Sequence, residues 1–322
     1  MDRLRRDGLA GIGWMMAANC LFATMTIAAR LASASAGWAT VGGARALGGA
    51  LVAAAFALGR GRSLRTSRPV LSWARSIFGT LSMLTTFYAL SSRELAVGDA
   101  VTLFATAPLF IALLSPVVLR ERTDPALWGV LVFAFVGVVL VAGPHFVQGG
   151  GKLLSLGSVP AISAFLAAVF SATAMMFLRM MRAGHGGGPP DSPEAIAFHF
   201  ATLGFVVHAA IASLDFHSPT LRDSGFLALA GVSGGLAQLA MTRAYALAPA
   251  AKLGAVGYAG TVLGFAGAVV FLGERPGWLQ LVGATLVVGA GVVLALISAR
   301  GHAAGAAPLG TSTSTAADAE RT

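Results

Sequence analysis

Residues 129–140 read GVLVFAFVGVVL, and residues 283–294 read GATLVVGAGVVL. Both segments begin with glycine, end in Gly-Val-Val-Leu and keep the same spacing between their first and last glycines. Glu121-Arg122 precedes the first segment, and Glu274-Arg275 precedes the second. The chain therefore contains an internal duplication with a period of about 150 residues.

The duplication extends towards the start of each copy. Tyr88 and the two residues after it return at Tyr245, and Arg30 in the first copy matches Arg179 in the second. Such a period is far longer than one solenoid unit, and duplicated halves of this length are typical of membrane transporters.

The composition indicates that the folded chain lies in a membrane and not in water. The 322 residues are 56% hydrophobic and only 11% charged, with a mean hydropathy of +0.79. Soluble domains carry about 25% charged residues, so this chain has too few to cover a water-facing surface. Apolar runs long enough to cross a bilayer, about 20 residues each, are predicted near residues 9–30, 38–58, 70–90, 97–119, 125–143, 155–178, 194–213, 224–245, 250–272 and 278–298. Because only helices satisfy their backbone internally at these lengths, we expect an all-α membrane protein with ten transmembrane helices.

The net charge of +9 follows the ends of these spans. With the N-terminus inside the cell, most arginines fall on the inner side, and Arg75 near the start of the third span is counted with them. This positive-inside bias predicts a multi-pass protein of the plasma (inner) membrane with both termini in the cytoplasm. The basic charge therefore indicates orientation and contact with membrane lipids, and no nucleic acid partner is expected.

The loop charges also explain the duplication. An odd number of spans in each copy forces the second copy to insert upside down. The loop at residues 60–68 is rich in arginine, whereas its counterpart at residues 215–223 has Arg222 between Asp215 and Asp223. We therefore expect two inverted five-helix repeats, residues 1–146 (spans one to five) and 147–299 (spans six to ten), and a disordered cytoplasmic tail at residues 300–322.

Proline and glycine positions predict local features of the spans. Pro108 and Pro116 fall inside span four, where proline removes a backbone hydrogen bond and kinks the helix. Two GxxxG pairs predict either close helix packing or small residues that leave room for the helices to rock. These pairs are Gly231 with Gly235 and Gly260 with Gly264.

The order of these motifs resembles a known family. Residues 238–249 read QLAMTRAYALAP and residues 273–276 read GERP. With the doubled Glu-Arg and the two five-span copies, they resemble EamA-type transporters of the drug/metabolite transporter superfamily, from about residue 9 to residue 298. The resemblance implies a ten-helix permease whose central cavity is formed by spans one to four and six to nine. The first copy departs slightly, with Arg120 where many relatives have glycine.

Arg45 is the clearest candidate for binding a solute. It lies in span two about 10 Å from the outer end, which is too deep for its side chain to reach the interface comfortably. Arg45 either faces a cavity and attracts a carboxylate, phosphate or polarised carbonyl, or it ties helices together through backbone carbonyls.

Four other polar residues lie inside the spans. Asn19 and Gln238 either bind a solute or bridge helices, and Tyr258 offers a ring and a hydroxyl suited to a cavity wall. His199, at the place in span seven that corresponds to Arg45, either binds substrate or carries a proton, or is a satisfied interface histidine. His208 is expected nearer the outer interface. Because no Asp or Glu lies deep in any span, we expect no dedicated carboxylate for proton coupling.

Enzymatic function is not expected. The chain has no phosphate-binding loop, no His-Glu-x-x-His and no Cys-x-x-Cys, and we predict no catalytic residue, metal or cofactor. The predicted function is a permease that moves a small metabolite by alternating access, such as an amino acid, a vitamin, a nucleotide-like cofactor or a drug-like solute. The alternatives are a translocator of a lipid-linked or amphiphilic carrier, in which Arg45 meets a phosphate, and an interaction scaffold. The expected partners are a small-molecule solute and membrane lipids, with a homodimer as an assembly that the sequence allows.

Overall fold

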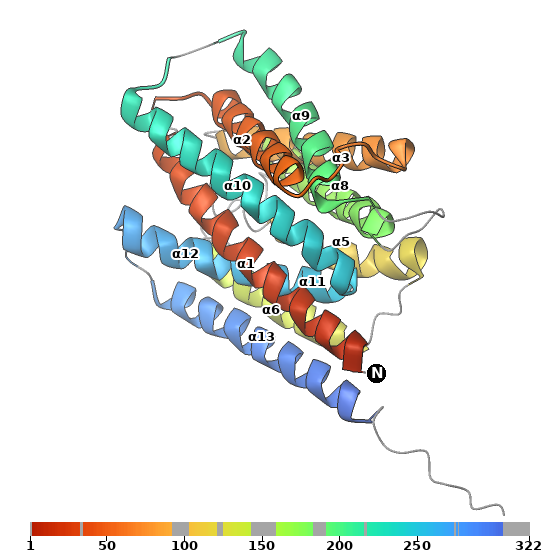
Figure 1. Ribbon diagram of the computed structural model, residues 1–322. Helices are drawn as coiled ribbons and strands as arrows, with labels where there is room; N and C mark the ends of the chain where they lie inside the picture. Colours follow the sequence, from red (N-terminus) through yellow and green to blue (C-terminus); the bar gives the residue numbers. More distant parts are fainter. Residues whose placement is uncertain are drawn as a thin grey trace, which may run out of the picture.

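The computed structural model is a bundle of helices (Figure 1). It describes residues 2–32, 35–91, 103–120, 125–142, 159–182, 191–215, 218–273, 275 and 277–304. The helices within these residues are α1 (Asp2–Ala32), α2 (Trp38–Gly59), α3 (Pro69–Ser91), α5 (Ala107–Leu114), the π-helix η1 (Ser115–Leu119), α6 (Pro125–Ala142), α8 (Val159–Arg182), α9 (Pro193–Ala212), α10 (Leu221–Leu247), α11 (Ala250–Gly257), α12 (Ala259–Leu272) and α13 (Trp278–Ala304).

Each span predicted from the sequence overlaps one helix or two consecutive helices. By length and composition, six stretches of the described residues are long and apolar enough to cross a membrane. These are Asp7–Ala32, Trp38–Gly59, Val159–Arg182, Pro193–Ala212, Leu221–Leu247 and Ala250–Phe271. Shorter apolar helices cover Ala107–Leu119, Pro125–Leu140 and Trp278–Val293. The described residues confirm the prediction of an all-α protein with membrane-capable helices, and the number of ten transmembrane helices stays a prediction.

Spans four and nine are both interrupted. In span four a turn at Thr106 precedes α5, and the hydroxyl and backbone N–H of Thr106 both donate to the Leu103 carbonyl. Pro108 then lies in the first turn of α5, and Pro116 lies in the π-helix η1. The predicted distortion by proline is therefore confirmed. In span nine the helix breaks at Tyr258, between α11 and α12, although the sequence has no proline there.

The residues that follow these two interrupted spans share one backbone conformation. Gly273 after α12 has a φ of +70°, and Arg120 after η1 has a φ of +56°. This left-handed region suits glycine and costs other L-residues about 1–2 kcal/mol. Arg120, where the resembled family has glycine, therefore holds a strained conformation. Glu121 and Glu274, the next residues of the motif, lie outside the described residues.

Replacing Arg120 by glycine is therefore expected to stabilise the protein. Removal of the strain outweighs the greater freedom of glycine in the unfolded chain, which leaves a net gain of about 0.5–1 kcal/mol. Thermal unfolding of the purified protein in detergent measures the effect. The reverse change, Gly273→Ala, should lower the unfolding temperature, and an Arg120→Gly protein that unfolds at or below the wild-type temperature would contradict the assignment of strain.

Helix packing follows the duplication. α1 packs against α10, and α8, which corresponds to α1, packs against α3, which corresponds to α10. In the same way α2 packs on α10 while α9 packs on α3. α2 packs on its own counterpart α9, and α6 packs on its counterpart α13. If each helix is replaced by its counterpart in the other half, the same set of helix contacts results. This is the pattern expected when the two halves are related by a two-fold axis.

Side-chain contacts give the directions of the first helix pairs. In the first half of α1, the Trp14 ring lies 5.2 Å from the guanidinium of Arg243, close to the end of α10. Just beyond the other end of α1, the Ser35 hydroxyl donates to the Asp223 carboxylate in the first turn of α10, at 2.5 Å. α1 and α10 therefore run antiparallel.

The same reasoning applies to α3 and α8. The Arg68 guanidinium, just before α3, donates to the carbonyl of Met181 at the end of α8, at 2.9 Å. Further along α3, the Ser82 hydroxyl donates to the carbonyl of Ala167 in the first half of α8, at 2.9 Å. These two helices are also antiparallel.

Close contacts give the remaining directions. α2 and α10 run parallel, because Gly48 contacts Gly231 and Gly49 contacts Gly235. α3 and α9 also run parallel, because Gly79 contacts Phe200 and Met83 contacts Gly204. α2 and α9 run antiparallel. Arg60, after the end of α2, donates a hydrogen bond to Glu194 in the first turn of α9. At the other end of the pair, Trp38 at the start of α2 contacts His208 near the end of α9. α1, α2 and α3 therefore run opposite to their counterparts α8, α9 and α10.

These directions bring many arginines to one end of the bundle. This arginine-rich end comprises Arg60, Arg62, Arg68, Arg179, Arg182 and Arg243, at the ends of α2, α8 and α10 and before α3. Buried Glu194 lies 2.8 Å from Arg60 and 3.7 Å from Arg62. The Asp191 carboxylate accepts hydrogen bonds from the Ser67 N–H, at 2.6 Å, and from the Thr66 hydroxyl, at 3.0 Å. The loop between α2 and α3 is therefore fixed against the start of α9.

Candidate functional site

A cavity of about 430 Å³ lies inside the bundle. Its described lining residues come from α1, α2, α3, α5, α8, α9, α10, α11 and α12 and from the breaks before α5 and α12. None of the described lining residues belongs to α6 or α13, which pack on each other, with α13 at the edge of the bundle (Figure 1). The cavity therefore has contributions from both halves of the chain, in the arrangement that the family resemblance implied.

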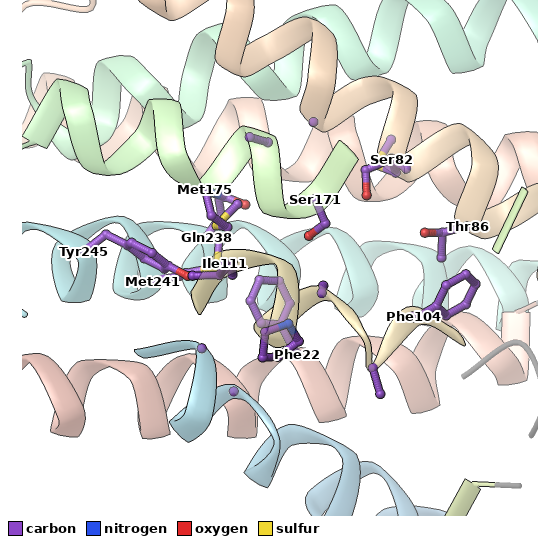
Figure 2. A pocket seen from close by; sticks show the side chains of 18 of the residues that line it. Phe22, Ser82, Thr86, Phe104, Ile111, Ser171, Met175, Gln238, Met241 and Tyr245 are labelled. Carbon is purple, nitrogen blue, oxygen red and sulfur yellow. The ribbon is translucent and has the colours of Figure 1, made fainter. Parts of the chain in front are cut away.

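The cavity wall is mostly apolar and carries a few polar groups. Figure 2 shows the hydroxyl-bearing Ser82, Thr86 and Ser171 around the same space as Gln238 and the ring of Phe22. A predominantly apolar wall with a small number of polar groups is typical of cavities that bind small molecules. The volume also falls within the usual range for such sites, about 300–1,000 Å³.

Arg45 lines this cavity, and the described contacts of its guanidinium are to weak acceptors. Its Nε lies 2.9 Å from the Met25 sulfur, and its Nη1 lies 2.6 Å from the Met83 sulfur. Thioether sulfur is a poor acceptor for a charged donor. Among the described residues the salt bridges are those of Glu194 with Arg60 and Arg62, so Arg45 has no carboxylate partner there. These contacts do not fit a helix tie through backbone carbonyls, which was the structural alternative.

A second cavity arginine, Arg75 of α3, was missed by the sequence analysis. Its side chain is buried, with 1% of the residue exposed, and its guanidinium carbon lies 4.3 Å from the centre of the Phe200 ring. Its Nε and Nη1 have no hydrogen-bond partner among the described residues. Gly79, one turn further along α3, makes room for it, because a Cβ there would overlap Nη1 of Arg75.

The depth of Arg75 in its helix was the available signal. α3 begins at Pro69, so Arg75 lies about 9 Å inside the helix. Arg75 therefore lies about as deep in α3 as Arg45 does in α2. Arg75 was instead counted among the basic residues of the cytoplasmic side, because it follows the arginines of the preceding loop closely in sequence.

Gln238 and Tyr258 also line the cavity. Tyr258 lies at the break between α11 and α12, where it is only 2% exposed and its hydroxyl has no hydrogen-bond partner among the described residues. The side-chain amide of Gln238 makes one long contact, 3.4 Å from its Nε2 to the hydroxyl of Thr242. Both side chains therefore retain hydrogen-bonding capacity at the cavity wall.

Asn19 and His199 do not line the cavity. The Asn19 amide donates to the Val256 carbonyl at 2.9 Å and so links α1 to α11. The Nε2 of His199 lies 2.9 Å from the Leu64 carbonyl, at the arginine-rich end. The structure therefore brings together three of the five predicted site residues and gives the other two contacts between chain segments.

His208 lies near the end of α9, and its side chain is packed inside the bundle. It is fully buried between the rings of Trp38 and Phe87, whose centres lie 6.2 Å and 5.9 Å from its own. Its Nδ1 lies 2.8 Å from the Gly204 carbonyl one turn earlier in α9, and its Nε2 has no partner among the described residues. The sequence did not reveal this location, because the aromatic neighbours come from α2 and α3.

An apolar helical bundle that encloses a solute-sized cavity between two related halves defines the class of multi-pass membrane transporters. A model of the EamA-like transporter family matches the chain twice, over residues 9–143 and 159–297. The chain belongs to this family, as the motifs of its two halves indicated, and the family's members are transporters and not enzymes.

Individual relatives support the same class. The chain is 30% identical over 221 residues to the pseudopaline exporter CntI of Pseudomonas aeruginosa (strain UCBPP-PA14). The aligned region covers 68% of this chain and 72% of the exporter. It is 28% identical over 299 residues to a riboflavin transporter of Vibrio cholerae, covering 88% of this chain and 92% of that protein. One solved crystal structure has the same fold, with a TM-score of 0.74 at 23% identity, over 91% of this chain and 99% of the other.

Proposed function

We propose that this protein is a permease of the plasma (inner) membrane that moves a small metabolite by alternating access. The solute occupies the cavity and contacts Arg45, Gln238 and Tyr258. The observation that carries this proposal is the cavity itself, because both halves of the chain line it and leave buried polar groups without strong partners there. Amino acids, vitamins, nucleotide-like cofactors and drug-like solutes are the classes to be tested.

The proposed topology has ten membrane spans in two inverted repeats, residues 1–146 and 147–299. The opposite directions of α1, α2 and α3 and of their counterparts support the inversion. The arginine-rich end faces the cytoplasm by the positive-inside rule, which places both termini there as well. In an inverted pair, the two halves can exchange conformations, and the cavity then opens to the opposite side of the membrane. A homodimer is an assembly to be tested separately.

Site-directed labelling and vesicle flux test the proposal together. Single cysteines at Arg65 and at Leu221, in a background with Cys20 replaced by alanine, should react with a membrane-impermeant maleimide from opposite sides of the membrane. Purified protein in vesicles should then take up members of a labelled metabolite set faster than empty vesicles do. Labelling of both positions from one side would refute the inverted topology. If no metabolite of the set entered the vesicles faster than it enters empty vesicles, the permease would be refuted.

A translocator of a lipid-linked or amphiphilic carrier is the second candidate. The unpaired guanidinium of Arg45 favours it, because a lipid phosphate is one anion that this group can bind. The same vesicles decide between the two, since a translocator moves a fluorescent phospholipid analogue between leaflets and a permease moves the water-soluble metabolite.

A further inference from the structure

We infer that the transported solute is a water-soluble organic anion whose carboxylate or phosphate group is bound by Arg45 and Arg75 together. This inference rests on the proposed function and adds the chemical class of the substrate. It requires that the two guanidinium groups face the same part of the cavity, that neither has an anionic partner among the described residues, and that the rest of the wall fits an organic body.

Arg45 and Arg75 meet around a shared neighbour. The Phe200 ring lies against the guanidinium of Arg75, and Phe200 and Arg45 also line the same small hollow beside the main cavity. Met83, which contacts Arg45, is one turn away from Gly79, which makes room for Arg75. Both arginines also line the main cavity itself. α2 and α3 therefore present two positive charges to one region of the cavity.

Within the part of the chain that the structure describes, no carboxylate neutralises these two charges. Among the described residues that line the cavity there is neither Asp nor Glu, and the salt bridges of the described chain lie at the arginine-rich end. Charges within a membrane protein are costly unless paired or in contact with water, and they mark solute pathways when they persist. An arginine fork matches a carboxylate or phosphate with two parallel hydrogen bonds, which gives specificity for such anions.

The remaining wall fits an organic body with apolar and uncharged polar parts. Phe22, Ile111 and Met241 supply apolar surface to the cavity, and Ile111 and Met241 lie beside Gln238 in the view of Figure 2. The amide of Gln238 and the hydroxyl of Tyr258, which has no hydrogen-bond partner among the described residues, supply neutral hydrogen-bonding groups from the second half of the chain. The first half therefore holds the anionic group, and the second half contacts uncharged parts of the same solute.

The test compares simple organic anions with neutral analogues of the same shape. Benzoate and phenyl phosphate are titrated against the purified protein in detergent, with benzamide as the uncharged control and thermal unfolding as the readout. At least one of the two anions should raise the unfolding temperature of the wild-type protein in a saturable manner, and benzamide should not. Arg45→Gln and Arg75→Gln should each weaken this anion binding by about 30-fold. Arg243→Gln, which removes an exposed arginine of α10, should leave it unchanged.

A second readout separates binding from a structural role. Without ligand, Arg75→Gln should unfold at or above the wild-type temperature, because it removes a buried cation that has no carboxylate partner among the described residues. A large fall in unfolding temperature, or anion binding that survives both substitutions, would overturn the inference. So would a wild-type protein that neither anion stabilises more than benzamide does.

The source of the anion is tested in the same way. Phosphatidylglycerol added to the detergent micelles, compared with phosphatidylcholine, supplies a lipid phosphate in place of the soluble one. Stabilisation by phosphatidylglycerol alone, lost in Arg45→Gln and Arg75→Gln, would overturn the water-soluble class in favour of a lipid substrate. Vesicle flux is scored independently, so carrier-dependent uptake of neutral or cationic metabolites only would overturn this inference while leaving the permease intact.

Discussion

Replacement of Arg45 by alanine is expected to reduce solute flux about 30-fold or more, while the folded protein remains in the membrane at the wild-type level. Truncation of one member of a buried, hydrogen-bonded charge pair costs about 2–5 kcal/mol of binding free energy. The lower value corresponds to about 30-fold. Stability should change little, because the partners that Arg45 loses within the protein are the weakly accepting sulfurs of Met25 and Met83.

The measurement is initial uptake into vesicles at a solute concentration well below saturation, normalised to protein that elutes as a single species. Arg243→Ala is the matched control, because Arg243 is exposed at the end of α10 and contacts the Trp14 ring outside the cavity. Arg45→Lys should fall between wild type and Arg45→Ala, since lysine keeps the charge but lacks the planar fork. Wild-type flux in well-folded Arg45→Ala protein would remove Arg45 from the solute pathway.

The sequence predicted the helices well because their signal is local. Each apolar run corresponds to a helix or a pair of helices, and Pro108 and Pro116 anticipated the distortion of span four. The break at Tyr258 in span nine was not anticipated, because no proline marks it. It is understandable only from the duplication, in which span nine is the counterpart of the interrupted span four. The duplication therefore indicates a break in span nine that the residues around Tyr258 do not themselves predict.

Individual site residues were harder to predict, because their roles depend on which helix faces which. Asn19 and Tyr258 both lie in apolar segments and have polar side chains, yet the Asn19 amide bonds Val256 and the Tyr258 hydroxyl remains unpaired at the cavity. Nothing in the sequence distinguishes these two outcomes. Arg75 illustrates the opposite problem, since its depth was readable but the preceding arginines concealed it.

Gly48 provides the prediction with the largest expected effect on stability. In the α2–α10 contact, a Cβ on Gly48 would overlap the Gly231 Cα and lie 2.5 Å from its carbonyl carbon. A Cβ on Gly231 would lie 2.9 Å from the Ala44 carbonyl oxygen. Because the opposing atoms belong to the backbone, they cannot move aside as a side chain does. The GxxxG pair Gly231 and Gly235 thus serves close packing, whereas a Cβ at Gly264 of the second pair would meet open space.

Gly48→Ala is therefore expected to destabilise the protein by about 3 kcal/mol, the upper part of the range for overpacking. The same substitution at Gly225, on the exposed side of α10 with no atom within 4 Å, should stabilise by up to about 1 kcal/mol through helix propensity. Equilibrium unfolding in mixed micelles measures both values. Once Gly48→Ala has separated the helices, Gly231→Ala should cost less in the double variant than alone, because the two glycines share one contact. Equal and additive effects at the three positions would show that α2 and α10 are not in backbone contact, and the pairing of the two halves through these helices would have to be abandoned.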